Sequence, residues 1–200
     1  MKDLTGTTDA ILMASGFSKR FGPRNKLLTP FRGKPLLQYP LDLLTSLSVF
    51  NKIFLVYNDP NVLEISNPYP IHTIYNARPE LGQRESIRLG VSASNADFYL
   101  FVPCDQPLLD ANTIHTILAR QSAGCIIEPT YDGKPGSPVL FSKSFRKELL
   151  TLCPASHARE LKRHHKDSLV RVPISNQHAL FDIDTPEDLE RLEVLFGNDG

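Results

Sequence analysis

The stretch from residue 13 to residue 26, MASGFSKRFGPRNK, carries residue types that bind phosphate. It leaves an apolar run, passes through Gly16 and Gly22, and contains Ser18, Arg20 and Lys26. Glycines let backbone N–H groups approach an anion, and the cations neutralise its charge. The spacing fits neither G-x-x-x-x-G-K-[ST] nor G-x-G-x-x-G, so Walker and dinucleotide loops are not supported. The segment predicts a polyphosphate loop of another kind; the alternative is a surface loop with incidental basic residues.

Two carboxylates follow apolar segments farther along the chain. Asp105 comes after the run 97–102 (DFYLFV), and Asp182 closes the short segment that begins at Phe181. Open α/β sheets bind ligands at the carboxyl ends of their strands, and Mg²⁺ prefers carboxylate and phosphate oxygens. We therefore expect Asp105 and Asp182 to converge on one divalent cation. The alternative is that each is simply a turn-forming residue.

The composition sets limits on the class of protein. The chain has 200 residues, of which 41% are hydrophobic and 22% charged, a globular composition. Lys+Arg and Asp+Glu both number 22, which argues against a nucleic-acid or membrane partner. The apolar runs fall short of the roughly 20 residues of a membrane helix. The three cysteines form no CxxC pair, and residues 1–9 are polar, so we expect a reducing, cytoplasmic location.

Charge is nevertheless unevenly distributed along the chain. Residues 10–41 contain six basic side chains and no acid, whereas residues 181–200 are strongly acidic. A local cation cluster suits an anionic ligand, although solvated helix faces would give the same pattern. Any anion site must therefore be local.

The order of apolar patterns predicts a doubly wound α/β sheet in a single domain spanning residues 1–200. Strands are expected at 10–14, 52–57, 97–102, 124–129, 139–141, 169–174 and 181–183. Helices are expected at 35–46, 85–93, 110–121 and 144–152, and from Pro186 onward. Asp110 is a plausible N-cap, and DTPED at 184–188 has a cap residue, an early proline and acids at the positive end of the helix.

The motifs together resemble the nucleotidyltransferases of the molybdenum cofactor cytidylyltransferase type. The resemblance is carried by ILMASGFSKRFGPRNKLL (11–28), FRGKPLL (31–37), GQRESI (82–87), PCDQPL (103–108), GKPGSPVLF (133–141) and DIDTPEDL (182–189). It implies a three-layer α/β/α Rossmann-like nucleotide-diphospho-sugar transferase fold with a mostly parallel sheet. It also implies that an acceptor phosphate attacks the α-phosphorus of a nucleoside triphosphate while pyrophosphate leaves.

Residue by residue, the resemblance assigns roles to the groups already noted. It implies catalytic roles for Arg20 and Lys26 and Mg²⁺ as the cofactor, with Asp105 and Asp182 as its ligands. The implied nucleotide-binding residues are Ala14, Ser15, Gly16, Ser18, Gly82 and Ser86.

The implied partners are CTP as the donor, a phosphorylated acceptor of the molybdopterin type, and a molybdoenzyme client. Two alternatives stay open: transfer to a sugar or polyol phosphate, and a non-catalytic accessory protein that binds nucleotide or cofactor. The chain departs from the family pattern at Ser15, at Ser137 where a histidine is expected, and across residues 154–159. If Ser137 and 154–159 line the acceptor pocket, these departures alter acceptor choice; otherwise 154–159 is a surface loop.

Overall fold

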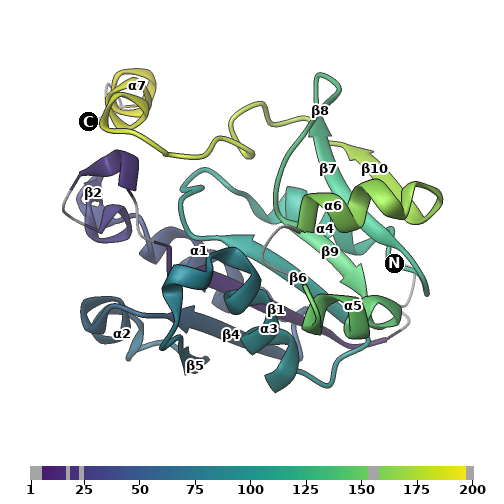
Figure 1. Cartoon of the computed structure of the whole chain (residues 1–200). Coiled ribbons are helices and arrows are strands. Elements are labelled where there is room, and N and C mark those ends of the chain that lie inside the picture. The colour runs from purple at the N-terminus through teal and green to yellow at the C-terminus, as the bar shows by residue number, and fades with distance from the viewer. Residues whose placement is uncertain (1–5, 17–18, 23–24, 153–157, 197–200) are drawn as a thin grey trace.

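The computed structural model describes residues 6–16, 19–22, 25–152 and 158–196. Its main sheet is mixed and mostly parallel (Figure 1). From one edge to the other the described strands are β10 (Leu169–Pro173), β7 (Ile126–Tyr131), β9 (Val139–Ser142), β6 (Phe98–Pro103), β1 (Thr8–Ala14), β4 (Lys52–Tyr57) and β5 (His72–Tyr75), with β8 (Lys134–Pro135) paired to β7. Strand β9 runs antiparallel to both β6 and β7, and the short β8 runs antiparallel to β7.

Strand β1 lies at the centre of the parallel part of the sheet. It pairs with β4 on one side and β6 on the other, so Ala14 lies level with Tyr57 and Met13 with Pro103. The strand is almost wholly buried, which explains its continuous apolar sequence. Because the strands end together, the residues that follow β1 and β6 meet at one edge of the sheet.

Helices cover both faces of the sheet and make three layers. Alternate residues of β1 point to opposite faces: Leu12 belongs to one apolar core and Ile11 to the other. The first core packs against α1 (Gln38–Ser46), α2 (Pro60–Ser66) and α4 (Ala111–Leu118). The second packs against α3 (Gln83–Ala93), α5 (Arg146–Leu150) and α6 (Ala158–His164). The predicted three-layer α/β/α architecture is confirmed.

Helix α7 (Pro186–Phe196) lies apart from the main sheet, next to a small hairpin of β2 (Pro30–Phe31) and β3 (Lys34–Pro35) (Figure 1). Phe31, Leu36, Ile183 and Leu192 form a third, smaller core there. This packing brings the C-terminal part of the chain against the loop that follows β1. Short 3-10 turns complete the described elements at Lys19–Phe21, Lys26–Leu28, Pro79–Leu81, Lys143–Phe145 and Lys166–Ser168.

Two local predictions are wrong, because other contacts replaced the expected elements. Residue Pro35 belongs to β3, and the helix starts three residues later at Gln38. Residues 181–183 form no strand; the N–H of Ile183 instead donates to the carbonyl of Asp105, 2.9 Å away. The predicted helix start at 184–188 is confirmed: α7 begins at Pro186, and Thr185 caps it. The N–H of Asp188 donates to Thr185 Oγ1 at 3.3 Å, and Asp188 Oδ2 accepts from the N–H of Thr185 at 2.9 Å.

Other local signals are confirmed or were missed. The side chain of Asp110 accepts from the N–H of Thr113, so it is the N-cap of α4 as predicted. Helix α2 and strand β5 were not predicted, because each is short and β5 is a mostly exposed edge strand. No described helix is long and apolar enough to cross a membrane.

Candidate functional site

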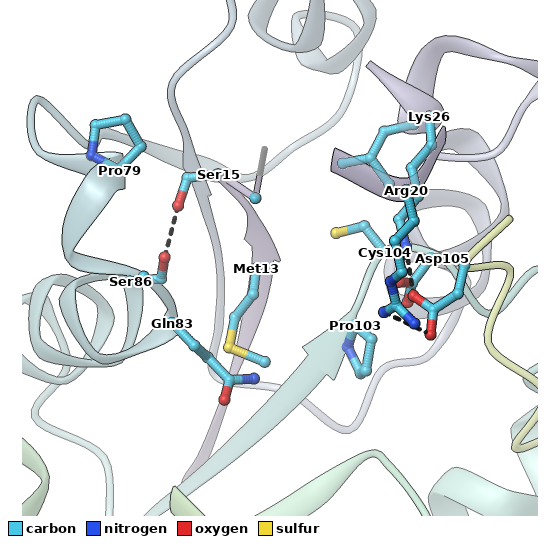
Figure 2. A pocket seen from close by; sticks show the side chains of 14 residues that line it. Met13, Ser15, Arg20, Lys26, Pro79, Gln83, Ser86, Pro103, Cys104 and Asp105 are labelled. Atoms are coloured by element: carbon cyan, nitrogen blue, oxygen red, sulfur yellow. Dashed lines mark hydrogen bonds and ion pairs between the residues drawn. The ribbon is translucent and has the colours of Figure 1, made fainter. Parts of the chain in front are cut away.

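A cavity of about 420 Å³ opens at the sheet edge where β1 and β6 end. Helix α3 and the 3-10 turn before it form one wall, and the loop after β1 forms the other. Its lining residues are Met13, Ser15, Gly16, Arg20, Lys26, Leu27, Pro79, Gly82, Gln83, Ser86, Pro103, Cys104, Asp105 and Asp184. Figure 2 shows two polar groups on opposite sides of the cavity, Ser15 with Ser86 and the charged Arg20, Lys26 and Asp105.

The charged side of the cavity is an ion cluster centred on Lys26. Its ammonium lies 2.5 Å from Asp105 Oδ2 and 3.2 Å from Asp184 Oδ1. It also donates to the carbonyl oxygen of Ile183 at 2.8 Å. Arg20 Nη2 contacts the other oxygen of Asp184 at 2.9 Å. The cluster thus joins the loop after β1, the end of β6 and the segment before α7.

The ion cluster fixes the charge of Lys26. Burial by itself would lower the pKa of this ammonium, but the negative charge and hydrogen bond of Asp105, followed by those of Asp184, raise it above the ordinary value. The Lys26 side chain is only 13% exposed, so its interactions with anions are weakly screened by solvent. A permanently cationic lysine inside a cavity suits a polyphosphate ligand.

The opposite side of the cavity is a neutral hydrogen-bond network. Ser15 Oγ and Ser86 Oγ lie 2.6 Å apart, and Asn76 Nδ2 donates to Ser15 Oγ at 3.0 Å. Asn76 is buried and is itself held by the N–H of Arg78, which donates to its Oδ1. Since the two serines share one hydrogen bond, the second hydroxyl hydrogen of the pair remains available to donate to a ligand.

Two glycines shape the cavity in different ways. Gly82, at the start of α3, has a φ of +72°, a conformation that a side chain disfavours. Gly16 has an ordinary φ, and a Cβ added there would meet no heavy atom of the described residues within 4 Å. A side chain at position 16 would therefore extend into the first cavity rather than against the described part of the chain.

Asp182 faces a second cavity of about 820 Å³ next to the first. Its carboxylate accepts a hydrogen bond from Gln106 Nε2 at 2.9 Å. Crowding by protein, followed by the negative charge of neighbouring Asp105, raises the pKa of Asp182 to about 6 even though the residue keeps a solvent-exposed surface. The other lining residues are Glu128, Pro135, Gly136, Ser137, Lys162, Arg163, Lys166, Leu169 and Arg171.

The structure gathers most of the sequence-predicted residues in one place. Seven of them line the first cavity: Ser15, Gly16, Arg20, Lys26, Gly82, Ser86 and Asp105. Asp182 lies beside them on the second cavity, the side chain of Ala14 is buried in the core, and Ser18 lies outside the described residues. Their roles remain predictions.

Sequence reasoning missed Asn76, Gln106 and the pairing of Asp184. In the sequence, Asp184 stands out only as part of the helix start at 184–188, and nothing local distinguishes Asn76 from an ordinary loop asparagine. Gln106 follows Asp105 directly and is 1% exposed. In the sequence, the carboxylate of Asp105 predicts metal binding, and nothing assigns a role to the glutamine beside it. Only the position of Gln106 inside the DQP motif could have drawn attention to it.

The residues present fit a magnesium ion that is shared with phosphate. Oδ1 of Asp105 is buried and accepts no hydrogen bond from any described residue, so it retains the capacity to coordinate a cation. The described part of the chain has no group of three His, Cys, Asp or Glu side chains arranged for a metal. Mg²⁺ is commonly held by one or two carboxylates together with substrate phosphates, which is the donor set available here.

The chain therefore combines an α/β/α fold with a basic loop after its first strand and a carboxylate at the end of a neighbouring strand. The solved structure of a nucleotidyl transferase from Methanothermobacter has the same fold, with a TM-score of 0.84, 19% identity, and 97% of this chain and 99% of that one covered. The chain belongs to the family of the MobA-like NTP transferase domain, which matches residues 10–169.

Curated relatives match nearly the whole chain at low identity. A molybdenum cofactor guanylyltransferase from Shewanella piezotolerans is 23% identical, covering 98% of this chain and 97% of its own. A molybdenum cofactor cytidylyltransferase from Escherichia coli is 27% identical, covering 90% and 92%. The fold is also that of molybdopterin-guanine dinucleotide biosynthesis protein A from Archaeoglobus fulgidus, with a TM-score of 0.72, 21% identity, and 96% and 99% of the two chains covered.

Proposed function

We propose that this chain transfers a nucleoside monophosphate from CTP to the phosphate of a molybdopterin-type acceptor and releases pyrophosphate. The observation that carries the proposal is the division of the first cavity into a cationic side, with Arg20 and Lys26, and a neutral hydrogen-bonding side, with Ser15 and Ser86. A triphosphate suits the first side and a nucleoside suits the second. The names of the relatives support the molybdopterin-type acceptor.

The chemistry asked of the protein is positioning and charge neutralisation. Lys26 and Arg20 would hold the triphosphate and stabilise the negative charge that develops as pyrophosphate leaves. Asp105 and Asp182 would hold Mg²⁺, which when bound neutralises phosphate charge. The serine pair would orient the nucleoside, because the hydrogen bond from Asn76 holds Ser15 in place.

The second cavity supports the acceptor half of the proposal. Four cations line it, Lys162, Arg163, Lys166 and Arg171, against the two acids Glu128 and Asp182. Lys162 and Arg171 both contact the buried carboxylate of Glu128, which holds them in place. An excess of positive charge next to the first cavity suits an acceptor phosphate. Ser137 lines this cavity, whereas residues 154–157 lie outside the described residues.

GTP is the second candidate donor, because relatives named for guanylyl transfer match the chain as completely as a relative named for cytidylyl transfer does. The motif likeness to the cytidylyl branch favours CTP. The residues of the serine network offer a hydrogen-bond donor that either base accepts.

Pyrophosphate release with each of the four common nucleoside triphosphates tests the proposal, using molybdopterin and a panel of sugar and polyol phosphates as acceptors. We expect release with CTP and molybdopterin, dependent on added Mg²⁺ and abolished in Asp105→Asn. Release with GTP alone would replace the donor, and release only with a sugar or polyol phosphate would replace the acceptor. Binding of a nucleotide without turnover on any acceptor would favour the accessory-protein alternative.

A further inference from the structure

The carboxylate of Asp184 contacts two different cations with its two oxygens. Oδ2 lies 2.9 Å from Arg20 Nη2, and Oδ1 lies 3.2 Å from Lys26 Nζ. The two cations are both expected to meet the triphosphate, and they come from different 3-10 turns of the loop after β1. Asp184 therefore bridges two parts of this loop from the opposite end of the chain.

The backbone of Asp184 is itself well anchored. Its N–H donates to the cap residue Asp188 at 3.1 Å, so the start of α7 holds it from one side. The neighbouring Ile183 is fully buried, donates its N–H to the carbonyl of Asp105 and accepts from Lys26 through its own carbonyl. Asp184 is thus a fixed point between α7 and the end of β6.

The side chain of Arg20 needs such an anchored partner to restrict its conformations. It is 69% exposed, and Asp184 is its ion-pair partner among the described residues. An exposed arginine has many rotamers, and an acceptor that restricts them preorganises the guanidinium for a ligand. Lys26 is held by Asp105 and Ile183 as well, so it depends less on Asp184.

We propose that Asp184 is a positioning residue, which orients the guanidinium of Arg20 toward the first cavity and links it to Lys26. The catalytic consequence rests on the proposed function, but the effect on the Arg20 side chain does not. A positioning role requires that the effect of removing Asp184 passes through Arg20. It also requires that the loss falls on turnover more than on nucleotide affinity.

A double-mutant cycle on full-length protein tests this role, using Arg20→Ala, Asp184→Asn and the double variant. We expect Asp184→Asn to lower kcat about ten-fold with little change in KM for the nucleotide, and to cause little further loss in the Arg20→Ala background. Asp184→Glu, which keeps both oxygens, should recover part of kcat. Asp42→Asn is the matched control, because it breaks another exposed ion pair, with Lys34, outside the cavity.

Nuclear magnetic resonance gives a second measurement that does not need turnover. Relaxation of the Arg20 Nε–H group should show greater mobility in Asp184→Asn than in the wild type or in Asp42→Asn. Unchanged Arg20 mobility, a loss that adds fully to that of Arg20→Ala, or tighter nucleotide binding at unchanged kcat would each overturn the proposal. A wild type that is inactive with every triphosphate, while Arg20 still loosens in Asp184→Asn, would count against the proposed function alone.

Discussion

Lys26 Nζ lies 2.5 Å from Asp105 Oδ2, although 79 residues separate the two along the chain. The Lys26 side chain is 13% exposed and that of Asp105 is 18% exposed, so neither charge is well solvated. Removing Lys26 leaves Asp105 as an enclosed charge without this cation, whereas Lys26 keeps its contact with Asp184 when Asp105 is removed. Variants at either position must therefore be assessed for stability and for catalysis separately.

Lys26→Met should lower kcat/KM by about 10²–10³-fold, the scale for losing one preorganised charge donor. Urea unfolding should also show a loss of stability, because Asp105 and Ile183 lose their shared partner. Steady-state kinetics and urea unfolding measure the two effects on the same preparation. Lys34→Met is the control, since it breaks an ion pair outside the cavity. Full activity in Lys26→Met would remove this residue from the mechanism.

Gly16→Ala should weaken nucleotide binding while leaving the thermal midpoint unchanged. The added methyl group meets no heavy atom of the described residues within 4 Å and lies at the lining of the first cavity, so KM should rise while folding is unaffected. Gly82→Ala is the instructive contrast. Its φ of +72° should make alanine cost about 1 kcal/mol of folding stability. Equal effects of the two variants on stability would contradict this distinction.

Ser15→Ala should reduce both nucleotide affinity and stability. The variant removes the acceptor of the buried Asn76 amide and one hydroxyl of the pair with Ser86, and an unsatisfied buried donor costs about 1–3 kcal/mol. Calorimetric titration of CTP and thermal unfolding report the two losses. Ser46→Ala is the control, because that exposed hydroxyl bonds only within the last turn of α1. A Ser15→Ala protein with wild-type affinity would exclude the serine pair from nucleotide binding.

Glu85 should give an acid-sensitive contribution to stability. Hydrogen bonds from Arg88 and then Arg78 outweigh burial and lower the pKa of this carboxyl from 4.5 to about 2. Because the folded-state pKa is depressed, the stabilisation is fully present above pH 4.5 and is lost as the pH falls toward 2. The difference in unfolding free energy between wild type and Glu85→Gln should therefore shrink across this range. A difference that stays constant with pH would contradict the assignment.

The sequence determined the central strands, the main helices and the identity of the site motifs. β4 (Lys52–Tyr57) begins and ends where its apolar run does, and the Asp110 cap of α4 is a local signal that the fold keeps. These features are local, because burial of consecutive side chains and capping of nearby N–H groups depend on neighbouring residues. Two predictions were wrong. Pro35 is part of a small hairpin instead of a helix, and the 181–183 segment donates a backbone hydrogen bond to Asp105 instead of forming a strand.

Only the tertiary structure decided which of the motif residues meet and which partners they have. Asp184 reaches Lys26 across 158 residues, and Asn76 reaches Ser15 across 61. Neither pairing has a local signature. The contact of Asp184 with Lys26 depends on how α7 packs against the hairpin β2–β3. The contact of Asn76 with Ser15 depends on β1 and β5 both flanking β4, because the ends of these strands then meet at one sheet edge. The same packing placed Asp182 on the second cavity beside the first. The residue types predict phosphate and metal binding, and long-range packing determines which of these residues come into contact.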